Sequence, residues 1–511
     1  MAFIWNFPLF TIVLSLFSGA LCMVLRPKAA RYYTIIYQCF LIILVSFVLW
    51  FTVTSDSQFT YSMGEFPAPW GNEIRGGVLE SLVALAMLLV LLASCVAGWH
   101  FLKIDIDESK INLYFSVINL ITAALMSLVW TNDIFTGYVF LEILTLSACG
   151  ITIVREVGRT TLAAVKYMIL NLMGSGLFLL GVVLLYDFTG QLLMVPMKSA
   201  VAAVLTDSES MPALTLSVAI MTIGLGIKSG LFPFHFWMPD SYGWSTPASA
   251  AILSSLVSKA YIFLLIKIYY RAVGIDVITQ TPILKMLFVL GICGIIFGSV
   301  SATSPDTLPR MIGFSSAAQI GYIYMGIGIG THLGFVAALF QLLTHMVTKA
   351  LVFLAAPYLE EASDNNIKFI FLQGAARRDR TAGLYFTFGA LSMVGIPCLG
   401  GFAMKLMYGQ AAISDPSSAK MFIIMITLAA SSFLNTLYFI RTVIRLYSDP
   451  EEKASSERQK LYKAQAENAK RAEGRRGFVI AGAFLMALNL FLGLFPWIFE
   501  ALINQGLAMF S

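Results

Sequence analysis

Fourteen predominantly apolar stretches recur along the chain, and they constrain its fold more than any other feature. About 20 residues of helix are needed to cross the hydrocarbon core of a bilayer. The stretches cover residues 4–24, 33–54, 77–97, 112–130, 134–154, 161–185, 213–234, 246–266, 286–302, 311–330, 333–357, 383–412, 421–440 and 477–499. We therefore predict an all-α polytopic membrane protein with about fourteen transmembrane helices.

The composition excludes the water-soluble classes of protein. Of the 511 residues, 58% are hydrophobic and 12% are charged, whereas a soluble domain has roughly 25% charged residues. No basic segment precedes the first apolar stretch, so we expect a membrane span there rather than a cleaved signal peptide. The six cysteines lie in or beside apolar stretches without paired spacing, which favours core packing over a metal or iron–sulfur site. We expect no metal, no cofactor and no catalytic centre on this chain.

The distribution of basic residues predicts the orientation in the membrane, because cytoplasmic loops carry an excess of Lys and Arg. If the N-terminus lies outside, the odd-numbered loops hold most of the 33 Lys and Arg residues. Six fall in the even-numbered loops, namely Arg75, Lys198, Lys267, Arg271, Lys285 and Lys420. This bias predicts that the N- and C-termini both lie outside.

A charged insert, residues 449–476, separates the last two apolar stretches. It is rich in Ala, Glu and Lys and contains opposite charges four residues apart, which stabilise an isolated helix. Two interpretations fit this pattern: a solvated cytoplasmic helix, or a docking surface for a partner subunit.

Ionisable side chains occur inside several apolar stretches, where a charge is costly and marks an interior aqueous path or a partner. They are Glu142, Lys166, Lys228, Lys259, His345, Lys349 and Lys405. Burial favours the neutral form of a lysine, and a nearby carboxylate favours its charged form. A lysine whose carboxylate partner can approach or withdraw is therefore a proton site that can be loaded and emptied. Several such lysines joined by water would form a proton relay.

The lysines also recur in two similar pairs, Lys166 with Lys228 and Lys349 with Lys405. In each pair the second lysine lies beside a helix-breaking segment, SGLFPFHFWMPDSYGWSTP (229–247) or GIPCLGGF (395–402). Broken helices at membrane depth are tolerated where protein or water satisfies the freed backbone groups. Interrupted helices in corresponding positions of two halves are typical of transporters built from inverted repeats.

The segments around these lysines resemble a known family. KSGLFPFHFWMPDSYGWSTPASAAILSSLVSKAYIFLL, AAVKYMILNLMGSGLFLLGVVLLY, QLLTHMVTKALVFLAA and GALSMVGIPCLGGFAMKL are similar to signature segments of antiporter-like subunits in the superfamily of respiratory complex I, Mrp antiporters and membrane-bound hydrogenases. The resemblance extends from about residue 77 to 445. It implies fourteen helices, two inverted five-helix repeats, and breaks in helices 7 and 12.

The resemblance also implies a division of the chain and a role for each polar residue. Helices 1–3 occupy 1–111, a first repeat 112–270, a second repeat 271–445, a cytoplasmic linker 446–476 and helix 14 residues 477–511. Glu142 matches the glutamate of span 5, Lys228 its lysine partner in span 7, Lys259 the relay lysine of span 8 and Lys405 the basic residue of span 12 near the exit. Lys166, His345 and Lys349 match further polar positions on the central axis. All seven are therefore predicted proton-translocation residues.

Two branches of the superfamily remain open. Many quinone-linked subunits carry a histidine six residues before the span-8 lysine, whereas this chain has Leu253. That difference, together with the loop MGEFPAPWGNEIRGG (63–77), favours the D-type protein of Mrp antiporters or its hydrogenase equivalent. Tyr261 and Cys398 replace residues that are common in the family. The alternative is a proton-pumping subunit of NADH:quinone oxidoreductase, and a third interpretation is a structural scaffold.

The resemblance implies a multi-pass subunit of the prokaryotic cell membrane. The expected partners are other antiporter-like and small membrane subunits, the lipid bilayer and, in a redox-driven complex, a peripheral redox arm. We expect no nucleic acid as a partner. The transported ion is expected to be the proton, because carboxylates and carbonyls suit Na⁺ whereas lysines dominate this axis. Coupling to sodium is left open.

Overall fold

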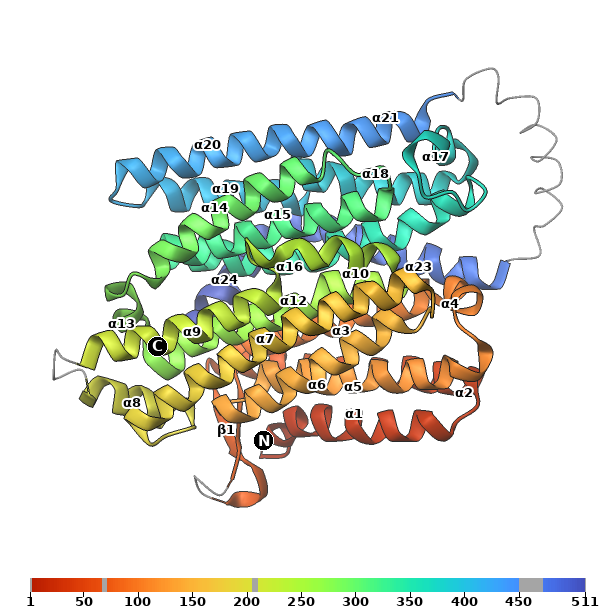
Figure 1. The fold of residues 1–511 in the computed structure, drawn as a ribbon. Coiled ribbons are helices and arrows are strands. Elements are labelled where there is room, and N and C mark those ends of the chain that lie inside the picture. The colour runs from red at the N-terminus through yellow and green to blue at the C-terminus, as the bar shows by residue number, and fades with distance from the viewer. Residues whose placement is uncertain (1, 67–70, 205–209, 450–471, 511) are drawn as a thin grey trace.

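The computed structural model describes residues 2–66, 71–204, 210–449 and 472–510. Long helices run side by side, and one short hairpin lies at the edge of the bundle (Figure 1). The hairpin pairs β1 (Phe59–Ser62) with β2 (Glu73–Gly76) in antiparallel register. The prediction of an all-α membrane fold is confirmed, with this hairpin as a small addition.

The first helices follow the apolar stretches closely, apart from two short helices at 99–105 and 194–204 that lie between the stretches. They are α1 (Phe7–Val24), α2 (Pro27–Ser55), α3 (Val78–Ala97), α4 (Trp99–Asp105), α5 (Ile111–Trp130), α6 (Ile134–Ile153), α7 (Gly158–Thr189), α8 (Met194–Val204) and α9 (Met211–Ser229). Capping residues determine where some of them begin. The Asp133 carboxylate accepts the backbone N–H groups of Phe135 and Thr136, and so satisfies donors that the first turn of α6 leaves free.

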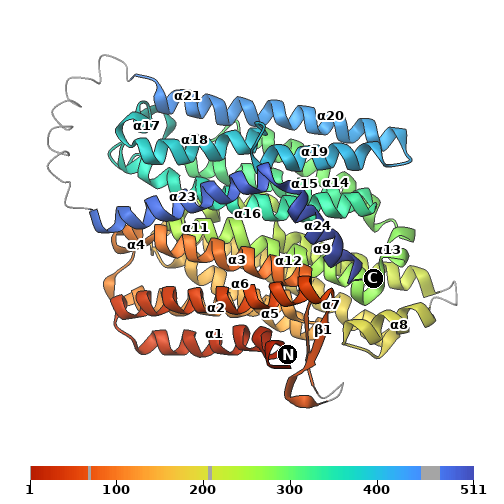
Figure 2. The same ribbon diagram turned by 180° about the vertical axis from the view of Figure 1, so that it is seen from behind.

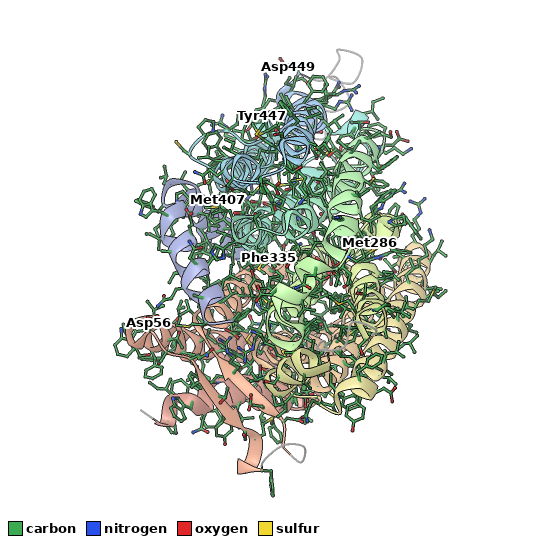
Figure 3. All side chains as sticks on the ribbon, turned by 90° about the vertical axis from the view of Figure 1, so that its left-hand side faces the viewer. Asp56, Met286, Phe335, Met407, Tyr447 and Asp449 are labelled. Carbon is green, nitrogen blue, oxygen red and sulfur yellow. The ribbon has the colours of Figure 1, made fainter. Side chains whose placement is uncertain are left out.

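The middle of the chain forms α10 (Met238–Trp244), α11 (Pro247–Ile252), the π-helical turn η6 (Leu253–Val257), α12 (Ser258–Lys267), a second π-helical turn η7 (Ile268–Val273), α13 (Ile275–Gln280), α14 (Ile283–Ser301), α15 (Leu308–Ile329) and α16 (His332–Glu361). Segments α11 to η7 make one continuous span, Pro247–Val273. This span and α16 are completely buried by other helices over their most apolar windows. They therefore form the centre of the bundle, and Phe335 of α16 lies near the middle of the cross-section in Figure 3.

The remaining helices are α17 (Ala375–Arg378), α18 (Arg380–Val394), α19 (Gly400–Ile413), α20 (Ser418–Asn435), the π-helical turn η9 (Thr436–Ile440), α21 (Arg441–Tyr447), α23 (Ala472–Leu494) and α24 (Pro496–Ala508). Short 3-10 turns include η5 (Phe234–Trp237) and η8 (Phe369–Phe371). Helices α23 and α24 cross the back of the bundle and pack against α3 and α16 (Figure 2). The chain thus brings its C-terminal helices against its N-terminal ones.

Twelve helices in the described part of the chain are long and apolar enough to cross a membrane. The stretches 311–330 and 383–412 lie outside that set and correspond to α15 and to α18 followed by α19. The number fourteen, the inverted repeats and the five-part division of the chain stay predictions. Most of the charged insert lies outside the described residues, which resume at 472.

The two predicted breaks are present, and the helix before each break ends with the same backbone conformation and hydrogen bond. The residue that follows α9, Gly230 (φ +82°), and the residue that follows α18, Gly395 (φ +95°), both adopt the left-handed conformation that glycine adopts without strain. In both cases the next residue, Leu231 or Ile396, donates its N–H to a carbonyl five residues back. This pattern terminates a helix while satisfying its last carbonyls. The chain then continues into α10 after the first break and into α19 after the second.

The short helices lie at two opposite ends of the bundle. Helices α4, α17 and α21 lie at one end, which we call the α17 end, and α8 and α13 lie at the opposite end (Figure 1). Lys267 and Arg271, expected in an outer loop, are instead buried within the span Pro247–Val273. Lys285 and Lys420 also fall within membrane spans, Ile283–Ser301 and Ser418–Tyr447. Two of the six basic residues assigned to even-numbered loops, Arg75 and Lys198, therefore remain outside the spans, and the predicted orientation stays a prediction.

Candidate functional site

A buried ammonium and a carboxylate meet where α9 ends. Lys228 occupies the last turn of α9 and is completely buried. Its Nζ donates to the Thr145 hydroxyl at 2.6 Å and lies 3.7 Å from Glu142 Oε1. Glu142 and Thr145 share one face of α6 because they are three residues apart. The sequence-predicted pair is thus brought together, although the closer contact of Lys228 is to a neutral hydroxyl.

Tyr261 completes this first group. Its hydroxyl lies 3.2 Å from the Thr145 hydroxyl, and its ring centroid lies 5.4 Å from Lys228 Nζ. Tyr261 is on α12, two residues after Lys259, so the same helix reaches the Glu142–Lys228 pair and carries the next lysine. The polar contacts therefore continue from α6 and α9 into the central span.

Lys259 is held at the π-helical turn of the central span. Its Nζ donates to the backbone carbonyl of Ser254 and lies 3.2 Å from the Ser258 hydroxyl. A π-turn leaves carbonyls of the preceding turn free to accept other donors, and such turns are frequent at functional sites. Leu253, at the start of this turn, is buried.

Lys349 lies on the other central helix, α16. It donates to the Ser315 hydroxyl and, at 3.1 Å, to the Ile312 carbonyl of α15. The next residue of α15, Ser316, has its hydroxyl 3.0 Å from that of Ser254, whose carbonyl accepts from Lys259. Two adjacent serines of α15 thus connect Lys259 with Lys349.

A small polar cavity continues from this point toward the break between α18 and α19. Its volume is about 10 Å³, about the smallest that holds one water molecule. It is lined by Gln319, Gln341, Thr344, His345, Thr348, Ser392, Met393, Gly401 and Met404. Within the described residues, both ring nitrogens of His345, Gln341 Oε1 and Thr344 Oγ1 are buried without a hydrogen-bond partner. Buried polar groups of this kind are normally satisfied by ordered water, so the lining suits a bridging water.

Lys405 spans the second break. It belongs to α19, yet its Nζ reaches back to the carbonyl of Val394 at 2.5 Å and to the Ser432 hydroxyl at 2.7 Å. Val394 is the last residue of α18, so the ammonium lies at the negative end of that helix dipole. Gly395 beside it has a φ of +95°, which favours glycine, and a Cβ there would also lie 3.0 Å from Lys405 Nζ.

Lys166 is the one predicted site residue that lies apart from the buried row. Its side chain is 46% exposed on α7, and its Nζ binds Asp240 Oδ2 at 2.8 Å. The other oxygen of Asp240 lies 3.3 Å from Arg310 Nη2. The expectation that Lys166 lies on the central axis is not met. Asp240 was not expected as its partner, although it stands in the same segment as the first break.

A second group of buried charges was missed by sequence reasoning. Arg75 and Glu80 form a fully buried ion pair, and Lys267 donates to the carbonyls of Val129 and Thr131. Arg271 donates to Asn132 Oδ1 at 3.0 Å. The sequence offered one indication that Lys267 and Arg271 are buried, which is their helical spacing from Lys259 on one continuous run. Glu80 lies only one turn inside the third apolar stretch.

Six of the seven predicted residues therefore lie in one row through the interior of the bundle, linked in part by hydrogen bonds and in part by the small cavity beside His345, and we call them the buried row. It runs from Glu142 and Lys228 through Lys259, Lys349 and His345 to Lys405, and crosses α6, α9, α12, α15, α16 and α19. Its acceptors are hydroxyls and backbone carbonyls, with one carboxylate at its start. In the parts of the chain that the structure describes, no group of three His, Cys, Asp or Glu residues is placed to hold a metal ion.

The sequence of residues 131–434 matches the model of a family described as "NADH:quinone oxidoreductase/Mrp antiporter, TM". The matched region contains every member of the buried row. The chain belongs to this family. It is an antiporter-like membrane subunit, as the resemblance implied.

Known relatives come from both branches of the family. The chain is 31% identical over 416 residues to the N subunit of the NADH-quinone oxidoreductase of Desulforudis audaxviator, covering 80% of this chain and 79% of that protein. It is 23% identical over 406 residues to the D-type protein of the Na⁺/H⁺ antiporter of Bacillus subtilis, covering 79% and 78%. Both interpretations left open by the sequence are supported, and neither is clearly better.

The fold is also that of a subunit in a known complex. The structure of the Mrp complex from Dietzia sp. DQ12-45-1b contains a chain that superposes with a TM-score of 0.84 at 20% identity, covering 99% of this chain and 97% of that one. The partners of this family member are accordingly other membrane subunits of a multisubunit complex. It is a multi-pass protein of a bacterial or archaeal membrane.

Proposed function

We propose that this subunit moves protons along the buried row, from the Glu142–Lys228 pair through Lys259, Lys349 and His345 to Lys405. The observation that carries the proposal is the pairing of ammonium groups with neutral acceptors, at the buried Lys228, Lys259 and Lys349 and at the half-buried Lys405. A charged ammonium in a low-dielectric interior needs a compensating charge. Where hydroxyls and carbonyls stand in for carboxylates, the protonated form is weakly held, and a proton can be passed on.

The Glu142–Lys228 geometry supports a loading step. A separation of 3.7 Å lies within ion-pairing range but beyond a hydrogen bond, and Lys228 is meanwhile held by Thr145. A small rotation of either side chain would close or open the pair. Closing favours the charged lysine and opening favours release of its proton.

The proximity of Lys349 to Lys259 supports transfer in the middle of the row. Both lysines are completely buried and are linked through Ser254 and two adjacent serines of α15, so a charge on one disfavours a charge on the other. Loading one lysine therefore favours unloading of the next. The polar cavity beside His345 supplies the step toward Lys405, where the break between α18 and α19 brings two helix ends together.

We also propose the finer features that the sequence predicted. The two similar breaks support a pair of inverted repeats with the ion path at the breaks. The excess of basic residues at the α17 end supports a cytoplasmic position for that end, with both termini outside. Protons are favoured over Na⁺ as the ion in this chain, because the ammonium groups already occupy the oxygens that Na⁺ would need. A role for Lys166 stays a prediction.

The branch is proposed from Leu253, which stands where many quinone-linked subunits carry histidine. It favours an Mrp-type or hydrogenase-type complex, with NADH:quinone oxidoreductase as the alternative. Purification of the intact complex from its native membrane and identification of its chains by mass spectrometry would decide. Small antiporter subunits or a nickel–iron hydrogenase pair would support the first interpretation, whereas flavin and quinone modules would contradict it.

The transport role is tested by substituting members of the row in the assembled complex and measuring proton movement in sealed vesicles. Substitutions that replace a titratable side chain of the buried row by one that cannot exchange a proton, without disturbing assembly, are expected to stop transport. Normal transport in such variants would contradict the proposal.

A further inference from the structure

A cavity of about 460 Å³ opens at the α17 end, outside the buried row. Its walls come from the loop between α14 and α15, from the segment around η8, and from η9 and α21. The lining residues are Ala302, Thr303, Ser304, Pro305, Asp306, Met311, Lys368, Phe369, Ile370, Tyr438, Arg441, Thr442 and Arg445. This volume is within the range of ligand-binding pockets, roughly 300–1,000 Å³. We call it the basic pocket.

The charge of the basic pocket is positive. Lys368, Arg441 and Arg445 contribute three cationic side chains, whereas Asp306 contributes one anion. In the part of the chain that the structure describes, none of the three cations lies within ion-pairing distance of a carboxylate. Arg377 at the same end, by contrast, is paired with Asp449. Three cations around one cavity without carboxylate partners indicate a site for an anion.

The pocket is built on a fixed frame. The backbone of Asp306 accepts the N–H of Phe369 at 3.0 Å, and Leu308 donates to the Ile367 carbonyl at 3.2 Å, so two walls are tied together. The third wall is joined through Arg445, whose guanidinium lies 5.7 Å from the ring centroid of Phe369. The cations are thus presented from three segments around one space, over a floor formed by the buried residues Met311, Tyr438 and Thr442.

An apolar border adjoins the pocket. Ile370 of the pocket wall is 66% exposed, and Ile444, which adjoins the wall, is 64% exposed. Ile444 belongs to the membrane span Ser418–Tyr447, which ends beside the pocket. The cations therefore stand at the level where a membrane span meets the aqueous phase. Lipid headgroups occupy this level, with acyl chains on its apolar side.

We propose that the basic pocket binds the phosphodiester headgroup of an anionic membrane lipid, with Arg441, Arg445 and Lys368 around the phosphate. Arginine and lysine side chains both form charge-assisted hydrogen bonds with phosphate oxygens. The exposed Ile370 and Ile444 side chains lie where acyl chains of the same lipid would pass. An inorganic phosphate ion shares the headgroup chemistry, but it would make no use of this apolar border.

The test uses the amine of Lys368 as a local reporter in the intact complex. The complex is placed in nanodiscs of phosphatidylcholine, with or without phosphatidylglycerol, and the rate of lysine acetylation is followed by mass spectrometry. We expect phosphatidylglycerol to slow acetylation of Lys368. Lys103, which is exposed at the same end outside the pocket, should react at the same rate in both nanodiscs.

Variants locate the effect in the pocket. Replacing both arginines, Arg441→Gln with Arg445→Gln, should weaken phosphatidylglycerol binding about tenfold or more, because hydrogen bonds between charged groups are lost. The matched control Arg380→Gln removes one exposed charge at the same end outside the pocket and should keep the protection. The double lysine variant, Arg441→Lys with Arg445→Lys, keeps both positive charges and should keep most of the protection of Lys368 from acetylation.

Four results would each overturn the proposal. Acetylation of Lys368 could be equally fast with and without phosphatidylglycerol, or the protection could persist in the double glutamine variant. Inorganic phosphate added to phosphatidylcholine nanodiscs could protect Lys368 as well as phosphatidylglycerol does, which would assign the pocket to a free anion. Loss of protection in the double lysine variant would contradict a site built on charge.

Discussion

The carboxylate of Glu142 lies 3.7 Å from the ammonium of Lys228, while a neutral hydroxyl, Thr145, holds that ammonium at 2.6 Å. The lysine is fully buried and the glutamate is partly exposed. A closed ion pair would hold the charge on Lys228, whereas this arrangement keeps its acid partner close but separate. Thr145 thereby becomes a residue that decides how far the pair stays open.

Replacing Thr145 by Val should therefore slow transport. The ammonium loses its hydroxyl acceptor and moves onto Glu142, so the pair closes and retains the proton. A hydrogen bond to a charged group contributes about 1.5–3 kcal/mol, which corresponds to about tenfold or more in rate if it controls opening. The measurement is the initial rate of proton movement into vesicles containing the assembled complex.

Thr152→Val is the matched control for that experiment. Thr152 lies two turns later on α6, and its hydroxyl bonds to the Ala148 carbonyl of its own helix. It should transport at nearly the wild-type rate. Equal rates for the two valine variants would contradict the role assigned to Thr145.

Substitutions of Lys405 separate a proton-releasing lysine from a structural one. Arginine keeps the positive charge at the end of α18 but does not release a proton at physiological pH. If Lys405 passes protons, both Lys405→Arg and Lys405→Ala should fail to build a pH gradient. If it only caps α18, Lys405→Arg should be nearly normal and Lys405→Ala damaged, and that ranking would rule out the release role.

The polar cavity beside His345 offers a second place at which a substitution should interrupt the proton path. Gln341→Leu removes a polar wall of a cavity that has room for about one water molecule, and it should slow transport without preventing assembly. Gln410→Leu, on the exposed face of α19, serves as the control. Proton movement in vesicles distinguishes them, and full activity of Gln341→Leu would show that the path does not cross this cavity.

Breaking the Arg75–Glu80 ion pair should lower the stability of the protein without removing a proton-transfer residue. Arg75 also donates to Gln58 and to the Met509 carbonyl, so it ties the hairpin to the C-terminal helix. Glu80→Gln leaves a buried guanidinium without its anion, which costs about 3–5 kcal/mol. Thermal unfolding of the purified complex should shift downward, whereas the exposed Glu108→Gln should leave it unchanged. No shift for Glu80→Gln would contradict a stabilising pair.

The sequence predicted the spans and both breaks because these depend on local features. Apolar runs of sufficient length form helices in a membrane, and glycines such as Gly230 and Gly395 readily adopt the left-handed conformation that ends a helix. The pairing of Glu142 with Lys228 followed from a resemblance to a family rather than from spacing.

The position of Lys166 could not be predicted, because α7 is apolar around most of its circumference and the sequence does not show which face is buried. Lys267 was missed for a similar reason: the central span continues beyond its apolar run into residues whose polar partners lie far away in sequence. In both cases tertiary packing determines whether the lysine is buried or exposed.

Glu142→Gln in the assembled complex tests the proton row most directly. Glutamine keeps the size of the side chain and its ability to hydrogen-bond, but it removes the negative charge that would compensate a loaded Lys228. The measurement is the pH gradient formed across vesicles that contain the complex with all its subunits. Proton transport by the buried row predicts near-complete loss of this gradient with normal assembly, and an undiminished gradient would contradict it.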